Sequence, residues 1–219
     1  MIGIRHAFAT ILSLTGLTAL AGLTPLLPVG TAMAQDAPAA LLTKPMALPD
    51  MALGSAKAPV LIVEFASMSC PHCAAFEQNV FPMLRSKYVD TGKVRFVFRE
   101  FPLDMKAVAA SMLARCIANG DPEKFFGAID ALFKHQDQLM AQTLETLQQI
   151  GKRAGMKDQG ADACVKDQAL LDKLSADQKF ANEELKVDAT PTFFINGKMF
   201  KGTMSFEELE EKIKPSLKK

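Results

Sequence analysis

The chain has 219 residues, of which 49% are hydrophobic and 22% charged, and its 25 basic side chains nearly balance its 24 acidic ones. This length allows one domain, or one domain with an insertion, and the apolar content excludes a disordered chain. The charge balance argues against nucleic acid as a partner, because domains that bind nucleic acid usually carry a basic surplus. Four cysteines are too few for a scaffold of this length held by disulfides. Composition therefore indicates a soluble globular protein with one core.

Residues 1–34 have the order of a secretory signal peptide. A short basic start with Arg5 precedes an uncharged run from Ala7 to Gln35, and Ala32 and Ala34 are small residues of the kind that a signal peptidase reads. The run is also long enough for an uncleaved membrane anchor, but two prolines and a glycine interrupt its second half. We therefore expect cleavage after Ala34 and export to a compartment in which disulfides persist.

The first strong structural pattern is the nearly continuous apolar run Val60–Ala66, which predicts a strand buried on both faces. Ser69 and Pro71 then open a helix, with the serine as its cap and the proline in its first turn. Pro82 is expected to kink this helix. Residues 94–98 form a second apolar run. A strand, a helix and a strand within ~40 residues predict a parallel crossover.

Between residues 103 and 187 the apolar spacing is that of amphipathic helices. Asp104 and Asp121 are placed to cap the first two of them, and the apolar residues between 143 and 185 predict two more. Residues 35–59, which are rich in Ala, Pro and Leu, are predicted to be an extended lead-in.

Strand character returns near the C-terminus, at residues 192–195. The dipeptide Asn196-Gly197 predicts a two-residue hairpin turn into a strand over 198–201. Ser205, with Glu208 three residues later, forms a capping box for a terminal helix.

The chemistry is concentrated at Cys70-Pro71-His72-Cys73. Two sulfurs in a first helical turn can close a small disulfide ring, and the free N–H groups of that turn stabilise a thiolate on Cys70. His72 can add a hydrogen bond or a positive charge. A structural zinc site needs two more ligands, but the chain has no second Cys-x-x-Cys and no pair of histidines. The motif therefore predicts a redox pair, with no metal and no added cofactor.

The motif and its context resemble the DsbA family of periplasmic thiol-disulfide oxidoreductases. Residues 63–73, Val-Glu-Phe, four residues and then Cys-Pro-His-Cys, are similar to the active-site region of the family. Residues 189–197 are similar to its second signature, where the family carries a cis-proline beside the active site. The resemblance implies an α/β protein with a thioredoxin fold interrupted by an all-helical domain. It divides residues 35–219 into thioredoxin-fold parts at about 58–102 and 188–219 and a helical insertion at about 103–187.

The same resemblance assigns roles around the motif. Cys70 is implied to be the reactive sulfur, with Pro71 and His72 between it and Cys73. Glu64, six residues before Cys70, matches the buried acid of thioredoxin-like proteins, which accepts a proton from Cys73. The alternative for Glu64 is an ordinary strand acid that faces solvent.

Four further residues receive roles in this way. Thr190 and Pro191 are implied to bind substrate, and Thr190 resembles the isomerase relatives rather than the valine of the best-known DsbA. Cys116 and Cys164 resemble the branch of the family with a second disulfide in the helical domain. We expect them to be joined, the alternative being two buried thiols.

The resemblance implies a periplasmic dithiol oxidase that acts as a monomer on reduced or unfolded exported proteins. A substrate thiolate attacks the exposed sulfur of Cys70, a mixed disulfide forms, and a second substrate cysteine resolves it. Reoxidation requires a membrane quinone-linked partner similar to DsbB. A disulfide isomerase or reductase that uses the same motif is the first alternative, and a non-catalytic thioredoxin-fold chaperone is the second.

Overall fold

A computed structural model of the chain describes residues 39–157 and 159–217, so the expected signal peptide, residues 1–34, lies outside the described residues. Five strands form one sheet in the order β1-β3-β2-β4-β5. The pair β2–β3 is parallel, as predicted, and the other neighbouring strands are antiparallel. The strands are β1 (Met51–Leu53), β2 (Val60–Ala66), β3 (Val94–Glu100), β4 (Thr192–Ile195) and β5 (Lys198–Lys201).

The stretch predicted to be an extended lead-in contains two elements instead. Helix α1 covers Ala39–Leu42, and β1 pairs with β3, Met51 opposite Phe98. The prediction was wrong here because three residues carry too little pattern to reveal a strand. Gly54 ends β1 with a φ of 86°, and a Cβ there would lie 2.3 Å from the carbonyl oxygen of Val94. Only glycine fits this close approach of the two backbones.

The first long helix is divided near Pro82, the residue expected to kink it. Helix α2 (Pro71–Asn79) ends before Val80, α3 covers Phe81–Leu84, and a π-helical turn, η1, covers Arg85–Val89. Pro82 lies in the first turn of α3, where a backbone N–H would have no intrahelical partner, so a proline costs no hydrogen bond.

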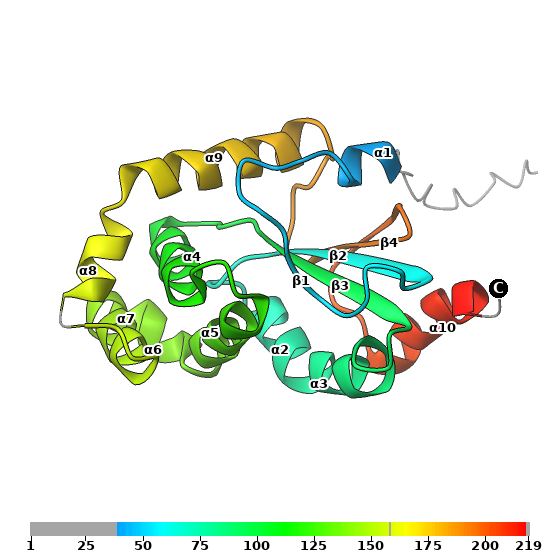
Figure 1. Ribbon diagram of the computed structural model, residues 1–219, viewed down its shortest axis with the longest axis horizontal. Coiled ribbons are helices and arrows are strands. Elements are labelled where there is room, and N and C mark those ends of the chain that lie inside the picture. Colours follow the sequence, from blue (N-terminus) through cyan, green and yellow to red (C-terminus); the bar gives the residue numbers. More distant parts are fainter. Residues whose placement is uncertain (1–38, 158, 218–219) are drawn as a thin grey trace, which may run out of the picture. The chain divides into compact units, whose positions relative to one another are not determined.

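Among the described residues between β3 and β4 there are six helices (Figure 1). The predicted caps are confirmed: a carboxylate oxygen of Asp104 accepts from the N–H of Ala107, and one of Asp121 accepts from the N–H of Glu123, both at 2.9 Å. Two of the helices, each of six residues, were not predicted because they are too short to show a period. The six are α4 (Met105–Ala118), α5 (Pro122–Lys134), α6 (Gln136–Ala141), α7 (Thr143–Arg153), α8 (Gly160–Val165) and α9 (Gln168–Glu183).

The C-terminal segment follows the prediction closely. Strands β4 and β5 are joined by Asn196 and Gly197, both with positive φ, as a two-residue hairpin turn requires. Helix α10 (Phe206–Leu217) begins with the predicted capping box, in which Ser205 and Glu208 each receive the other's backbone N–H.

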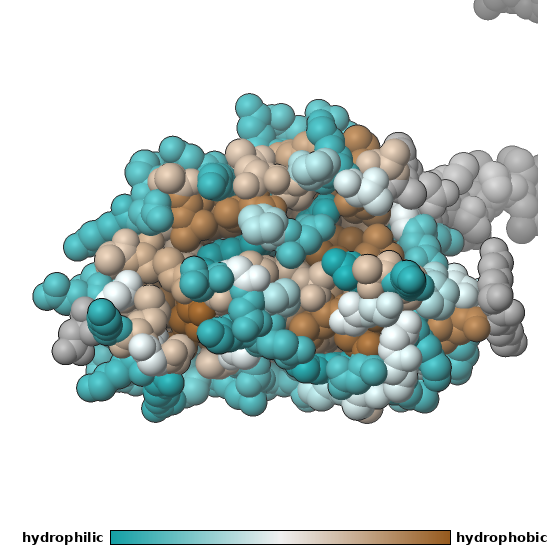
Figure 2. Space-filling model, viewed as in Figure 1, coloured by the Kyte–Doolittle hydropathy of each residue, from teal (hydrophilic) through white to brown (hydrophobic). Residues whose placement is uncertain are grey.

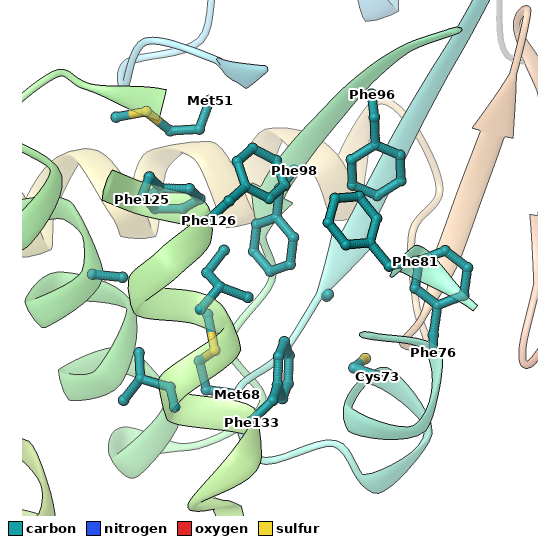
Figure 3. Packing of buried hydrophobic residues seen from close by; sticks show 14 of the residues in the cluster. Met51, Met68, Cys73, Phe76, Phe81, Phe96, Phe98, Phe125, Phe126 and Phe133 are labelled. Carbon is teal, nitrogen blue, oxygen red and sulfur yellow. The ribbon is translucent and has the colours of Figure 1, made fainter. Parts of the chain in front are cut away.

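An aromatic cluster holds α2 and α3 against the sheet and the helical part. The rings of Phe76 and Phe193 lie 4.7 Å apart, and those of Phe81 and Phe126 are stacked at 5.6 Å. Figure 3 shows Cys73 beside this cluster, between Phe76 and Phe133 in the view. Each such ring pair contributes about 1 kcal/mol beyond its burial. The cluster therefore fixes the position of the helix that carries the cysteines.

The other face of the sheet is covered by α9 and by α1, through a second buried cluster that includes Phe65, Phe194 and Leu185. Apolar residues reach the surface shown in Figure 2 as separate areas among hydrophilic ones. No helix in the described ranges combines the length and the apolar character that crossing a bilayer requires.

Candidate active site

The two motif cysteines lie at the start of α2. Cys70 is the N-cap residue, with φ −85° and ψ 117°, and Cys73 lies in the first turn. The prediction that Ser69 caps this helix is wrong: its hydroxyl lies 3.0 Å from that of Ser67 instead. The helix begins one residue later than expected, because the N–H of Cys70 donates to the carbonyl of Ser67 in a turn that precedes the helix. The sulfur of Cys70 therefore stands where the helix N–H groups are free.

The second signature of the sequence lies directly beside Cys70. The thiol of Cys70 donates to the carbonyl oxygen of Thr190 at 3.3 Å, across 120 residues of sequence. The peptide bond between Thr190 and Pro191 is cis. The hydroxyl of Thr190 is buried and has no hydrogen-bond partner among the described residues. The fold thus brings the two predicted substrate-binding residues to the reactive sulfur.

The two sulfurs differ sharply in acidity. A hydrogen bond from the Cys73 thiol is the main reason that the pKa of Cys70 falls from 9.0 to about 5, and the backbone N–H groups of Cys73 and His72 act in the same direction. Burial opposes this shift. The pKa of Cys73 is raised, first by burial and then by its bond to Cys70. At neutral pH the pair therefore holds one thiolate, on Cys70, and one thiol, on Cys73.

Cys70 is less exposed than the sequence suggested. Cys70 is 5% exposed and Cys73 is 1% exposed, whereas the expectation was an exposed Cys70 sulfur. Pro71 and His72, between them, lie at the surface. The backbone N–H of His72 is one of the groups that lower the pKa of Cys70.

Glu64 is buried, which excludes the alternative of a strand acid that faces solvent. It is 1% exposed and lies on β2, between Phe98 of β3 and Phe193 of β4. Burial raises the pKa of this carboxyl well above its usual range, and the charges of Glu77 and Cys70 add to the rise. The charge of Glu64 in turn raises the pKa of Cys73. The ionisation of Glu64 is therefore coupled to that of both cysteines.

Two residues of the site were missed by sequence reasoning. The side-chain amide of Gln136, the first residue of α6, donates to the carbonyls of Met68 at 2.8 Å and Cys70 at 3.1 Å. Glu77, on α2, is 4% exposed, and burial followed by the charge of Asp130 raises its pKa to about 8. A lone glutamine in a distant helix carries no sequence signal. Glu77 lies one helical turn after Cys73, on the same face, and this spacing is the signal that could have found it.

The other two cysteines form a disulfide away from this pair. Cys116 of α4 is bonded to Cys164 of α8, with their Cα atoms 6.2 Å apart. Within the described ranges no three His, Cys, Asp or Glu side chains gather as a metal-binding group.

Comparisons with known proteins agree with this arrangement. Residues 47–215 match the family model described as thioredoxin. A Rickettsia bellii protein with the provisional name protein-disulfide oxidoreductase is 36% identical over 150 residues, which are 68% of this chain and 57% of that protein. The chain spans only 53% to 57% of the length of the curated Rickettsia relatives that it matches.

Solved structures show the same fold. Alpha-DsbA1 from Wolbachia pipientis is 33% identical, with a TM-score of 0.74 over 81% of this chain and 94% of that one. A protein-disulfide isomerase from Novosphingobium aromaticivorans is 26% identical, with a TM-score of 0.66 over 78% of this chain and 100% of that one.

The sheet, the helix that starts at a Cys-x-x-Cys pair and the matched residues define a thioredoxin-fold protein. Within this class, the chain belongs to the DsbA family of thiol-disulfide oxidoreductases. The predicted fold, a thioredoxin fold with an inserted helical domain, is thereby confirmed.

Proposed function

We propose that the chain is a dithiol oxidase, which donates the Cys70–Cys73 disulfide to reduced, newly exported proteins. The observation that carries the proposal is the contrast between the two sulfurs, one with a pKa near 5 and the other with a raised pKa. A thiol of low pKa is a good leaving group, so a protein joined to Cys70 by a disulfide is released readily.

The reaction consists of two exchanges. A substrate thiolate attacks the sulfur of Cys70, the Cys70–Cys73 bond breaks, and Cys73 leaves and takes up a proton. A second substrate thiolate then attacks the substrate sulfur of the mixed disulfide, and Cys70 leaves as a thiolate. The substrate loses two electrons and gains a disulfide, and the cysteine pair is reduced.

Glu64 supplies the proton that Cys73 requires. Burial raises the pKa of this carboxyl well above its usual range and so favours its protonated form, which can give a proton to the departing sulfur. In the reverse direction it accepts the proton of Cys73. Without such a partner, a charge would remain on a buried sulfur, which is costly.

Thr190 and Pro191 bind the substrate segment next to Cys70. The carbonyl of Thr190, 3.3 Å from the Cys70 sulfur, is the acceptor within reach of an incoming backbone N–H. Pro71 and His72, which are exposed, form the other edge of this approach.

The setting of this activity is the periplasm, reached through a signal peptide that is cleaved after Ala34 and leaves a monomeric mature domain, residues 35–219. The thioredoxin-fold parts are about 58–102 and 188–219, and the insertion is about 103–187. Reduced or unfolded exported proteins are the substrates, and a DsbB-like, quinone-linked membrane protein is the reoxidant. Cys116–Cys164 is a structural disulfide.

The second candidate function is that of an isomerase or reductase. Thr190 favours it, because this residue lies beside the reactive sulfur and, by the resemblance described above, is similar to the isomerase relatives. The name of the Novosphingobium aromaticivorans protein also points in this direction. Such a protein uses the same thiolate but remains reduced in its compartment.

Equilibration of the purified protein with glutathione buffers distinguishes the two functions. An oxidase should have a potential near about −120 mV, an isomerase near about −180 mV and a reductase near about −270 mV. In parallel, Cys70→Ser should abolish oxidation of a reduced, unfolded substrate, and Cys73→Ser should trap mixed disulfides. Oxidation by Cys70→Ser at the wild-type rate would refute the role given to Cys70.

A further inference from the structure

A hollow of about 400 Å³ lies among α4, α5 and α7 of the helical part, which adjoin in Figure 1. Its volume is within the range of small-molecule sites, about 300–1,000 Å³. Ile117 of α4, Ala128 and Ala131 of α5, and Ile150 of α7 give it an apolar lining. None of these residues takes part in the exchange reaction proposed above.

Basic groups also line the hollow: Lys124, Arg153 and His135. The residues that line it include no acid, and neither Lys124 nor Arg153 forms a salt bridge with any described residue. An apolar cavity with unpaired cations at its edge is complementary to a ligand with an apolar body and a negative charge.

One of these cations is held in place. The ring of His135 donates through Nδ1 to the carbonyl of Ala131 at 2.8 Å, which leaves Nε2 as an acceptor. A guanidinium nitrogen of Arg153 lies 3.3 Å from that Nε2. The contact uses one N–H of the guanidinium, and the others remain able to bind a planar carboxylate in the bidentate manner.

Gly127 keeps the hollow open. It lies inside α5, where glycine costs about 1 kcal/mol relative to alanine. Packing does not explain its presence, because a Cβ at this position would meet no atom within 4 Å. Since Gly127 lines the hollow, any side chain there would take up space within it.

We propose that this hollow binds a small organic acid, with its carboxylate on Arg153 and its apolar body against Ile117 and Ile150. The apolar lining favours such an acid over inorganic phosphate, which has no apolar part to bury. This binding activity is separate from the disulfide exchange, so either can fail without the other.

Calorimetric titration of the purified protein with 4-phenylbutyrate tests the proposal, and 4-phenylbutan-1-ol serves as the uncharged probe. We expect saturable binding of the acid with a Kd below about 1 mM. Arg153→Gln should weaken it about tenfold. Lys152→Gln removes the same charge from the neighbouring exposed residue, outside the hollow, and should leave the affinity unchanged. The alcohol should bind more weakly than the acid.

Gly127→Leu should fill the hollow and abolish binding while the melting temperature stays at or above that of the wild type, because leucine favours the helix. No saturation up to about 10 mM acid, equal affinity for the alcohol, or wild-type binding by Gly127→Leu would each overturn the proposal. If Gly127→Leu does not fold, the affinities of Arg153→Gln and Lys152→Gln for the acid test the proposal instead, and equal affinities would overturn it.

Discussion

Removing the Cys70 thiolate should destabilise the protein at neutral pH by an amount that follows from its pKa. The cleanest comparison is Cys73→Ser with Cys70→Ser/Cys73→Ser, because neither variant can form the active-site disulfide and both keep a hydrogen-bond donor at position 73. No reductant is then needed, and Cys116–Cys164 stays intact. Ionisation of Cys70 is the main difference between the two variants.

The magnitude follows from linkage between ionisation and folding. A pKa of about 5 in the folded protein, against 9.0 for an ordinary cysteine, corresponds to about 2.7 kcal/mol at pH 7. Screening by solvent at the edge of the site reduces this to about 2 kcal/mol. Because the folded pKa is depressed, the stabilisation is complete above pH 9 and is lost as the pH falls through 5.

Urea unfolding of both variants from pH 4 to pH 8 measures this difference, with thiolate absorbance of Cys73→Ser as the independent titration. The difference in free energy of unfolding between Cys73→Ser and the double variant should increase with pH above pH 5, by up to about 1.4 kcal/mol per pH unit. A difference that does not change with pH, or a thiolate midpoint near 9, would refute the reasoning. In the wild type, the same 2 kcal/mol favours the reduced form and makes the pair more oxidising by about 40 mV.

Other predictions concern single side chains. Glu64→Gln should slow exchange at pH 7 by about 100-fold while leaving attack at Cys70 possible, because Cys73 loses its proton partner, and stopped-flow mixing with a reduced peptide across the pH range checks this. Cys116→Ala/Cys164→Ala should lower the free energy of unfolding by about 4 kcal/mol, since the bridge closes a loop across 48 residues, and urea titration of the oxidised protein measures it; a loss below about 1 kcal/mol would contradict the loop argument. Gln136→Leu leaves two carbonyls of the active-site loop without their donor. We therefore expect the free energy of unfolding to fall by about 1–3 kcal/mol and the thiolate titration of Cys70 to shift. A titration like that of the wild type would limit Gln136 to a structural role.

The local features of the fold were predictable from the sequence. Strand β2 and the hairpin follow from an apolar run and from Asn196-Gly197, and the caps at Asp104 and Asp121 follow from the chemistry of a helix start. The cysteine pair was evident from its spacing and from the strand before it. In each case the determining interactions lie within a few residues of one another.

What could not be predicted depends on contacts between distant parts of the chain. Strand β1 exists because β3 offers it an edge, and Gln136 matters only because the fold brings α6 to the loop before α2. The cap at Ser69 was wrong for the opposite reason, since a tight turn at Ser67 competes locally for the same residues. Such outcomes are decided by which of several acceptable local arrangements the tertiary structure selects.

The burial of the two cysteines bears on how a substrate approaches them. Cys73 is 1% exposed and packs in the buried cluster that contains the aromatic rings, whereas Cys70, at the start of the helix, is 5% exposed. For the proposed oxidase, such burial favours a substrate cysteine on an extended segment over one on a rigid, convex surface.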